Sequence, residues 1–502
     1  MKNVSKKLTN ILLTLLPPAL FLSYHPVISL AETPTMNLEF SIAELWLILL
    51  FVVSLPHLLD LIKFYGLKRL LIIAVVPLYL LTTAIWSKNH LRALLTAGIF
   101  GLLVYVALYI IYIIKRNNSL LTLVVKSLIV SAIIASAFCW LQCFLDLAGV
   151  PRDYSLLCKG CVSTTFGFPH PNGFAIEPQF MGNLLIAPIL LCFYYLSTRQ
   201  VKKRKLLILA TVFLCMTLFI TFSRGAIYST LIGLIIQQIL LRKQKHHQKG
   251  RFIKATMLVL MSFFLSVCIQ GVFAAVGPTS DNFVAGVTKS LHQLSLGKVD
   301  LRPESLKQET ENNDKQSVPE NEETPEPTSQ GQSSDMDSAK DSSFSGYVEE
   351  STNIRLNLNE LAFRTWLSSP RYILLGTGLG SAGIAMHNYS PEEIGQKEIV
   401  QNQYVSLLLE TGLVGIVAII TVIALAIKRY LKITKEDRLP IIKSKPLFFS
   451  VLAGFLLSLF FFSGLPNAIH IYFFIVIIFL VDSSKNHPVI KQKVKNHNHH
   501  SH

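Results

Sequence analysis

Long, continuous apolar stretches recur along this chain, and they constrain its fold more than any other feature. A helix needs about 20 mostly apolar residues to cross a hydrocarbon core about 30 Å thick. Only helices or closed barrels satisfy every backbone polar group in lipid, and these unbroken runs lack the alternation of barrel strands. The sequence therefore predicts an all-α polytopic membrane protein with about 12 transmembrane helices, at residues 10–30, 41–60, 68–86, 92–114, 120–146, 182–198, 205–222, 225–241, 253–276, 401–427, 446–464 and 467–482.

Two long connections divide these predicted spans into three groups, and a basic, His-rich tail follows the last group. A large loop thus precedes the tenth span. The predicted parts are five spans in 1–146, a loop at 147–181, four spans in 182–276, a large loop at 277–400, three spans in 401–482 and the tail at 483–502.

The short connections are rich in Lys and Arg, which predicts the orientation because cytoplasmic loops retain positive charge. Counting spans puts both termini and every basic cluster of these connections on the cytoplasmic side of the plasma membrane, and Lys88 and Arg92 are the exception, because twelve spans leave them outside. If the first segment were instead a signal cleaved near Ala31, no later span would change sides. The clusters are Lys2/Lys6/Lys7, Lys63/Lys68/Arg69, Lys115/Arg116, Arg199 to Lys205, Arg242 to Lys254, Lys428 to Lys445 and the tail from Lys485.

The formal net charge of +16 does not point to nucleic acid once the charges are placed on this topology. Residues 301–350 hold thirteen acidic and four basic residues, so the rest of the chain carries 42 basic and 17 acidic residues. Most of that surplus faces the cytoplasm and anionic membrane lipid. The acidic segment, about 298–350, has almost no aliphatic residues, and we expect it to be a disordered insertion.

Four arginines fall on the predicted outer side, although most basic residues are predicted on the cytoplasmic side. Arg224 lies at the turn between two spans, where Arg is costly unless it is paired, hydrated or bound to an anion. Simple snorkelling to the interface is the alternative. Arg355, Arg364 and Arg371 follow in a predicted amphipathic surface helix from Asn353 onward. Because guanidinium groups bind phosphate oxygens in pairs, the four arginines are candidates for an anion pocket.

Outer His and Glu residues are candidates for proton transfer. His170 and His387 could each act as a base near neutral pH, although loop histidines often have no such role. Glu177 is a second possible base, or a carboxylate beside a helix N-terminus. Cys158 and Cys161 could close a small disulfide, whereas zinc would need two more ligands. We therefore expect no metal site and no cofactor.

The start of the tenth predicted span carries a polar stripe. Asn402, Ser406 and Glu410 recur at four-residue spacing and so share one face of the helix. A carboxylate more than a turn inside a span suggests either function or a buried partner. Helix capping or packing remains an equal alternative for the stripe.

These motifs together resemble the O-antigen ligase/polymerase family of bacterial envelope glycosyltransferases. The resemblance covers roughly residues 165–430. It rests on Pro171 to Pro178, Thr221-Phe-Ser-Arg224-Gly-Ala226, Arg364-x-Trp366 before Pro370, the Leu375-Gly-Thr-Gly-Leu-Gly380 turn, and Asn402-x-Tyr404 leading to Glu410-Thr-Gly412-Leu-Val-Gly415.

The resemblance implies a metal-independent, inverting enzyme of the GT-C type. Its donor would be a glycan on a polyprenyl pyrophosphate at the outer face of the membrane, and its acceptor a saccharide, a lipid or a protein. Arginines would hold the pyrophosphate, with His170, Asn402, Tyr404 and Glu410 contributing to substrate binding. The family's usual basic His is replaced here by Gln401, whose amide cannot accept the proton, so His387 or Glu177 is expected to replace it.

A transporter or flippase of lipid-linked saccharide is the alternative function for a chain with twelve spans. Transporters favour repeated halves and ionisable groups near the midplane of the membrane. Here the polar candidates gather on one side, which favours chemistry at the membrane surface.

Overall fold

The structure of this chain is a computed structural model, and it is almost entirely helical. Cys158, Cys161 and positions 298–343 of the predicted insertion lie outside the described residues. The structure describes residues 2–33, 36–148, 150, 163–165, 168–198, 203–242, 250–277, 282–295, 344–435, 445–461 and 468–483.

Helices account for nearly all of the regular structure, and two small antiparallel hairpins account for the rest. The strands β1 (Val27–Thr33) and β2 (Met36–Ser41) form one hairpin, and β3 (Ser163–Thr165) and β4 (Phe168–His170) form the other. The helices are α1 (Lys2–Thr14), α2 (Leu16–Phe21), α3 (Ile42–Ser54), α4 (Leu58–Tyr65), α5 (Leu67–Thr82), α6 (His90–Arg116), α7 (Asn118–Leu147), α8 (Pro178–Thr198), α9 (Arg204–Ile220), α10 (Arg224–Arg242), α11 (Gly250–Val276), α12 (Phe283–Leu294), α14 (Phe344–Leu367), α15 (Pro370–Leu375), α16 (Ala382–Tyr389), α17 (Gln403–Lys435), α19 (Pro446–Ser458) and α20 (Ile469–Ser483), with 3-10 turns at Leu55–His57 and Thr83–Ile85.

Within the described residues, 8 helical stretches are long and apolar enough to cross a membrane, and α19 and α20 are shorter apolar helices. The protein is therefore an all-α polytopic membrane protein, as predicted. The long stretches are Ile42–Tyr65, Leu67–Ile85, His90–Arg116, Asn118–Leu147, Pro178–Thr198, Arg224–Arg242, Ile253–Val276 and Gln403–Leu425.

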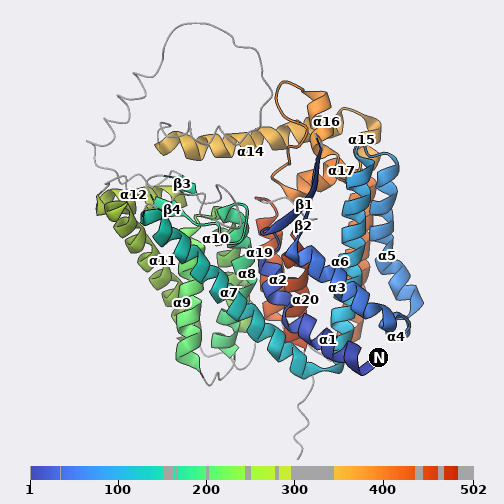
Figure 1. Ribbon diagram of the computed structural model, residues 1–502, viewed down its shortest axis with the longest axis horizontal. Helices are drawn as coiled ribbons and strands as arrows, with labels where there is room; N and C mark the ends of the chain where they lie inside the picture. Colours follow the sequence, from blue (N-terminus) through green and yellow to red (C-terminus); the bar gives the residue numbers. More distant parts are fainter. Residues whose placement is uncertain are drawn as a thin grey trace, which may run out of the picture.

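Helix α8 lies at the centre of the bundle. Most of its apolar stretch is buried inside the protein, and it packs against α7, α9, α10, α19 and α20 (Figure 1). Small residues let its neighbours approach closely, since lipid provides little hydrophobic drive for association. A Cβ added at Gly454 of α19 would lie 3.1 Å from the carbonyl oxygen of Ser229 in α10. The α8–α10–α19 contact therefore fixes the rigid core of the fold.

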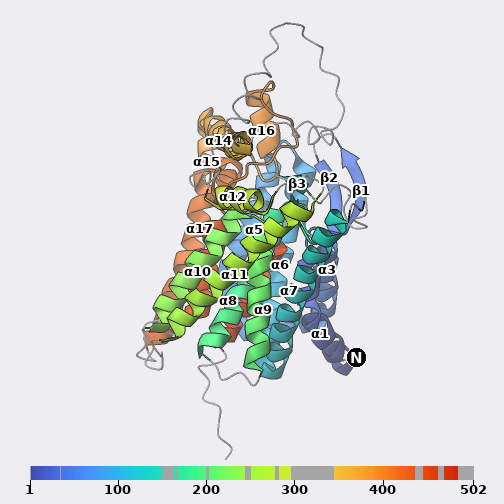
Figure 2. The same cartoon turned by 90° about the vertical axis from the view of Figure 1, so that its left-hand side faces the viewer.

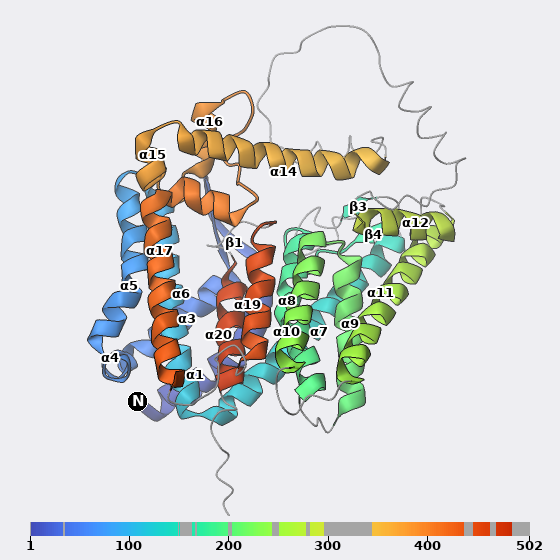
Figure 3. The same ribbon diagram turned by 180° about the vertical axis from the view of Figure 1, so that it is seen from behind.

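Most of the elements that do not span the membrane gather at one end of the bundle, which we call the α14 end, whereas α1 lies at the opposite end (Figure 1). There α14 runs across the tops of the spans, and α12, α15, α16 and both hairpins lie beside or beneath it (Figures 1 and 2). Figure 3 shows the same arrangement from behind. Among the described residues, the basic end of α6 at Lys115 and Arg116 and the start of α9 at Arg204 lie at the opposite end (Figures 1 and 3).

The amino-terminal segment differs from the single span predicted at residues 10–30. Helix α1 ends at Thr14, and α2 begins at Leu16 with proline in its first turn, because proline cannot continue the preceding hydrogen-bond ladder. Leu13, Leu16 and Leu20 are nevertheless almost fully buried in the core. Beyond Phe21 the chain enters the β1–β2 hairpin, so the apolar run is an interrupted helix followed by a strand.

The predicted amphipathic helix after Asn353 is present and longer than expected. It begins at Phe344, so residues 344–350 of the predicted insertion form the start of α14. Its apolar side packs on protein: Leu361 and Ala362 share a cluster with Met386 of α16 and Leu409 of α17. The helix therefore covers the bundle instead of resting its apolar side on lipid.

Candidate functional site

Arg224 is the first residue of α10 and follows a tight turn from α9. Phe222 in that turn has φ of 48°, in the left-handed region that bulky residues rarely adopt. Close packing holds the turn in place. A Cβ at Gly182 of α8 would lie 2.7 Å from the Ser223 Cβ, and one at Gly225 would lie 2.9 Å from the Phe461 Cβ. The backbone that carries Arg224 is thus fixed between α8 and the end of α19.

Gln179, in the first turn of α8, contacts both this turn and α14. The Ser223 hydroxyl donates to the Gln179 carbonyl oxygen at 3.5 Å, and the Arg355 Nη2 donates to the Gln179 side-chain oxygen at 3.3 Å. Arg355 comes from α14, 131 residues further along the chain than Arg224. One glutamine therefore contacts Arg355 itself and the residue immediately before Arg224.

Glu177 lies close to Gln179 and Arg355, immediately before the first residue of α8. Burial raises the pKa of its carboxyl group, and the nearby Arg355 guanidinium counteracts part of that rise. A carboxylate in this setting is a stronger proton acceptor than an exposed one, because burial disfavours its charged form. Glu177 and Arg355 are thus electrostatically coupled across the boundary between α8 and α14.

His170, at the end of β4, packs next to the same turn. Its ring stacks on Phe222 with centroids 4.7 Å apart, and it is almost fully buried. Burial lowers the pKa of His170 to about 3, so the imidazole is neutral at physiological pH. Because the ring is neutral, His170 can pack against the turn that carries Arg224, but it adds no positive charge there.

The amino-terminal end of α17 reaches this region through α19. The backbone N–H of Gln403 donates to the Leu459 carbonyl at 2.9 Å, and the Tyr404 ring packs on Phe460 with centroids 4.5 Å apart. Asn402 caps the helix, since its side-chain oxygen accepts from the Tyr404 N–H at 3.0 Å. Through Phe460 and Phe461 this end of α17 therefore adjoins Gly225 and Arg224.

Gln401, which stands where the family's usual His is expected, precedes this cap. Its side-chain oxygen is buried and has no hydrogen-bond partner among the described residues. A buried, unsatisfied carbonyl oxygen can accept a hydrogen bond from a bound hydroxyl group. Gln401 can thus orient a substrate but cannot remove its proton.

Glu410 belongs to a different cluster, formed around residues 375–380, which we call the glycine-rich turn. Its carboxylate accepts backbone hydrogen bonds from Gly380 and Ala382, and Arg92 lies close enough to interact with it electrostatically. The Thr377 and Gly378 N–H groups donate to the carbonyl groups of Leu409 and Glu410, at 2.8 and 3.0 Å. Of the polar stripe on α17, Glu410 therefore binds the turn that follows α15, whereas Asn402 caps the helix.

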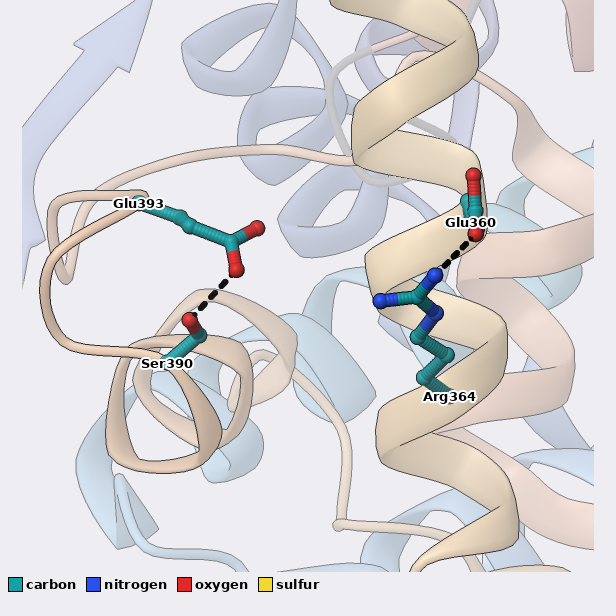
Figure 4. A network of polar contacts seen from close by, with 4 residues as sticks. All are labelled: Glu360, Arg364, Ser390 and Glu393. Carbon is teal, nitrogen blue, oxygen red and sulfur yellow. Dashed lines mark hydrogen bonds and ion pairs between the residues drawn. The ribbon is translucent and has the colours of Figure 1, made fainter.

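The other predicted residues point elsewhere. Arg364 pairs with Glu360 on the exposed side of α14, while Ser390 donates to Glu393 at 2.7 Å in the loop after α16 (Figure 4). Nine residues separate Arg355 from Arg364, so at 100° per residue their side chains leave opposite faces of α14. Arg371 is exposed and donates to the Trp86 carbonyl oxygen at 3.4 Å.

His387 lies on α16, in the second cluster. Its Nδ1 is 2.7 Å from the Ile394 carbonyl oxygen, which makes Nδ1 the donor and leaves the acceptor lone pair of a neutral ring on Nε2. The ring is partly buried. His387 is therefore a chemically competent base, but it lies with the glycine-rich turn and not with Arg355.

The structure thus sorts the predicted residues into two groups. The first, which we call the Gln179 site, comprises His170, Glu177, Gln179, Arg224 and Arg355, with Gln401, Asn402 and Tyr404 at its edge. Arg371, His387 and Glu410 lie around the glycine-rich turn. Sequence reasoning missed Gln179 and Arg92; Gln179 gave no signal, whereas Arg92 was visible as an exception to the charge distribution.

Comparison with known proteins gives one match. A family model described as O-Antigen ligase matches residues 209–420, which run from α9 to the middle of α17 and include Arg224, Arg355 and Glu410. No curated protein matches the chain, and no solved structure matches it.

Proposed function

We propose that the chain is an O-antigen ligase/polymerase-like membrane glycosyltransferase that transfers a glycan from polyprenyl pyrophosphate, since a family model described as O-Antigen ligase matches residues 209–420. The observation that carries this proposal is that Gln179 contacts both Arg355 and Ser223, the residue immediately before Arg224. Two guanidinium groups on separate elements fit a diphosphate, which offers several oxygens to paired donors. The acceptor is a growing saccharide chain, a lipid or a protein.

The reaction that we propose is a displacement at the anomeric carbon. An acceptor hydroxyl loses its proton to a base and attacks this carbon, while the carbon–oxygen bond to pyrophosphate breaks with inversion. The lipid pyrophosphate leaves with the electron pair, and arginines stabilise its negative charge. Because the donor already carries this leaving group, the transfer needs no nucleotide, and we propose that it needs no metal ion.

We assign the base to Glu177, with His387 as the competing candidate. Glu177 lies beside Arg355, next to the proposed leaving-group site, and its raised pKa suits proton transfer. Gln401, with a buried unpaired oxygen, would accept a hydrogen bond from the acceptor or donor sugar. His387 would serve only if the acceptor enters along the glycine-rich turn.

We further propose that the α14 end faces away from the cytoplasm. The basic residues at the described span ends opposite α14, such as Arg116 and Arg204, support this orientation, because cytoplasmic loops keep positive charge. A flippase or transporter is the competing function. The Gln179 site lies at one end of the spans and not at their midplane, which favours transfer over transport.

The test is to replace Arg355 by Gln and Arg224 by Lys, and to measure glycan transfer from a polyprenyl-pyrophosphate donor in membranes. A charge-assisted hydrogen bond contributes about 1.5–3 kcal/mol, so each variant should lose roughly ten- to a hundredfold in rate. Arg364→Gln is the matched control. It removes the same charge from the same helix, on the opposite face, and should stay within about twofold of wild type.

Equal losses in the Arg355 and Arg364 variants would refute the Gln179 site. Undiminished transfer by Arg355→Gln at normal expression would refute the diphosphate assignment itself. If lipid-linked glycan crossed the membrane at a normal rate but was never transferred by the wild-type protein, the transporter would be correct.

A further inference from the structure

A hollow lies far from the Gln179 site, at the opposite end of the bundle. It is formed by the end of α8 and the starts of α9 and α11, with a volume of about 300 Å³. We call it the α8–α11 groove. No residue of the Gln179 site lines it, so whatever binds there does not depend on glycan transfer.

The walls of this groove are apolar and open toward the lipid side of the bundle. Phe193 and Leu196 form the inner wall, while Ile208, Met257 and Met261 line the rest. Met257 is 62% exposed and Met261 45% exposed. In a membrane protein such side chains meet acyl chains, so the groove opens sideways into the bilayer and not into water.

Two cationic side chains also line the groove. Arg204 is the first residue of α9, Lys254 lies in the second turn of α11, and both are exposed. The groove thus combines an apolar slot with two positive charges at the end of the spans where the headgroups of a bilayer lie. That combination is complementary to an amphiphile with an acyl chain and an anionic head.

We propose that the α8–α11 groove binds an anionic phospholipid of the surrounding leaflet. One acyl chain lies along Phe193, Ile208 and Met261, and the headgroup phosphate lies between Arg204 and Lys254. Basic pockets between spans are suited to anionic headgroups, and two nearby cations add appreciably to the attraction. A zwitterionic lipid fills the slot equally well but gains less from the two charges.

Native mass spectrometry of the full-length protein, titrated with phosphatidylglycerol or phosphatidylcholine, tests this proposal. We expect a first phosphatidylglycerol adduct at a concentration at least tenfold below that for phosphatidylcholine. Arg204→Gln/Lys254→Gln should remove this preference. The matched control is Lys203→Gln/Lys205→Gln, which removes two exposed charges from the same stretch of chain without touching the groove, and it should retain the preference.

A further variant tests the apolar slot with both charges intact. Met261→Trp should fill the groove and weaken the first phosphatidylglycerol adduct by about tenfold. Equal effects of the two double variants would overturn the proposal in favour of diffuse surface charge. Equal binding of the two lipids by the wild type would also overturn it, as would an undiminished adduct in Met261→Trp. Binding of inorganic phosphate with the same affinity would identify a free-anion site and contradict the lipid assignment.

Discussion

At the scale of single residues, the pKa of Glu177 depends on two features, the burial of its carboxyl group and the nearby Arg355 cation. Desolvation raises the pKa of the Glu177 carboxyl group, and the Arg355 cation opposes that rise. If Glu177 is the base, transfer requires its ionised form, so the rate rises with pH through this pKa. Titration of His170 adds no further step to this pH–rate profile, because burial lowers its pKa to about 3 and the ring stays neutral.

Replacing Arg355 by Gln should therefore move the acidic limb of the pH–rate profile to higher pH, since the opposing cation is lost. Arg355→Lys keeps the charge and should leave the limb where it is, even though its rate is lower. The measurement is residual glycan transfer between about pH 5 and 9. A limb that stays in place in Arg355→Gln but disappears in His387→Ala would transfer the role of base to His387.

At the scale of the elements, the junction of α15 and α17 shows why the turn after α15 is rich in glycine. The backbone of this turn lies so close to the backbone of α17 that a side chain does not fit between them. Gly376 has φ of 73°, and a Cβ there would lie 2.4 Å from the Glu410 carbonyl group. Gly412 has φ of 59° and interrupts the helical backbone of α17 where the turn packs against it. The motif is thus a packing device that fixes α16 and α17 relative to each other.

Gly376→Ala should destabilise this junction by about 2–4 kcal/mol, because it combines overpacking with a left-handed residue. Thermal unfolding in detergent measures this as a fall in Tm of roughly 5 °C or more. Gly395→Ala is the control, since a Cβ there meets nothing within 4 Å. A Tm within about one degree of wild type for both variants would contradict the packing role.

Across the whole molecule, charge is distributed unevenly between the two ends of the bundle. Among the described residues, Lys115 and Arg116 end α6 and Arg204 begins α9 at the end opposite α14, whereas Lys88 and Arg92 lie at the α14 end. Arg92 is held there by Glu410 and the glycine-rich turn. The two exceptions in the sequence pattern thus belong to the α14 end and need no change in the orientation of the spans.

Cysteine labelling tests this orientation directly. In a chain whose seven native cysteines are changed to Ala, Lys88→Cys should react with a membrane-impermeant maleimide added to intact cells. Arg116→Cys, at the other end of α6, should react only after the membrane is permeabilised. Both positions are exposed, so the reverse pattern would invert the proposed topology.

The sequence by itself determined the helical membrane fold, because long apolar runs have few other stable forms in lipid. It also indicated the side on which the polar candidates gather, since short loops record insertion through their charge. Residue types pointed to anion binding by four arginines, Arg224, Arg355, Arg364 and Arg371. The apolar runs and the residue types are local signals that can be read within about twenty residues of chain, and the orientation needs only a count of these runs.

Only the tertiary structure decided which candidates act together. Arg355 and Arg364 have the same chemistry and lie nine residues apart, yet one contacts Gln179 and the other an exposed glutamate. That choice depends on which face of α14 packs on the bundle, and this face is set by Leu361, Ala362 and their partners in α16 and α17. Packing between segments distant in sequence leaves no local pattern, so Gln179 became visible only in the folded chain.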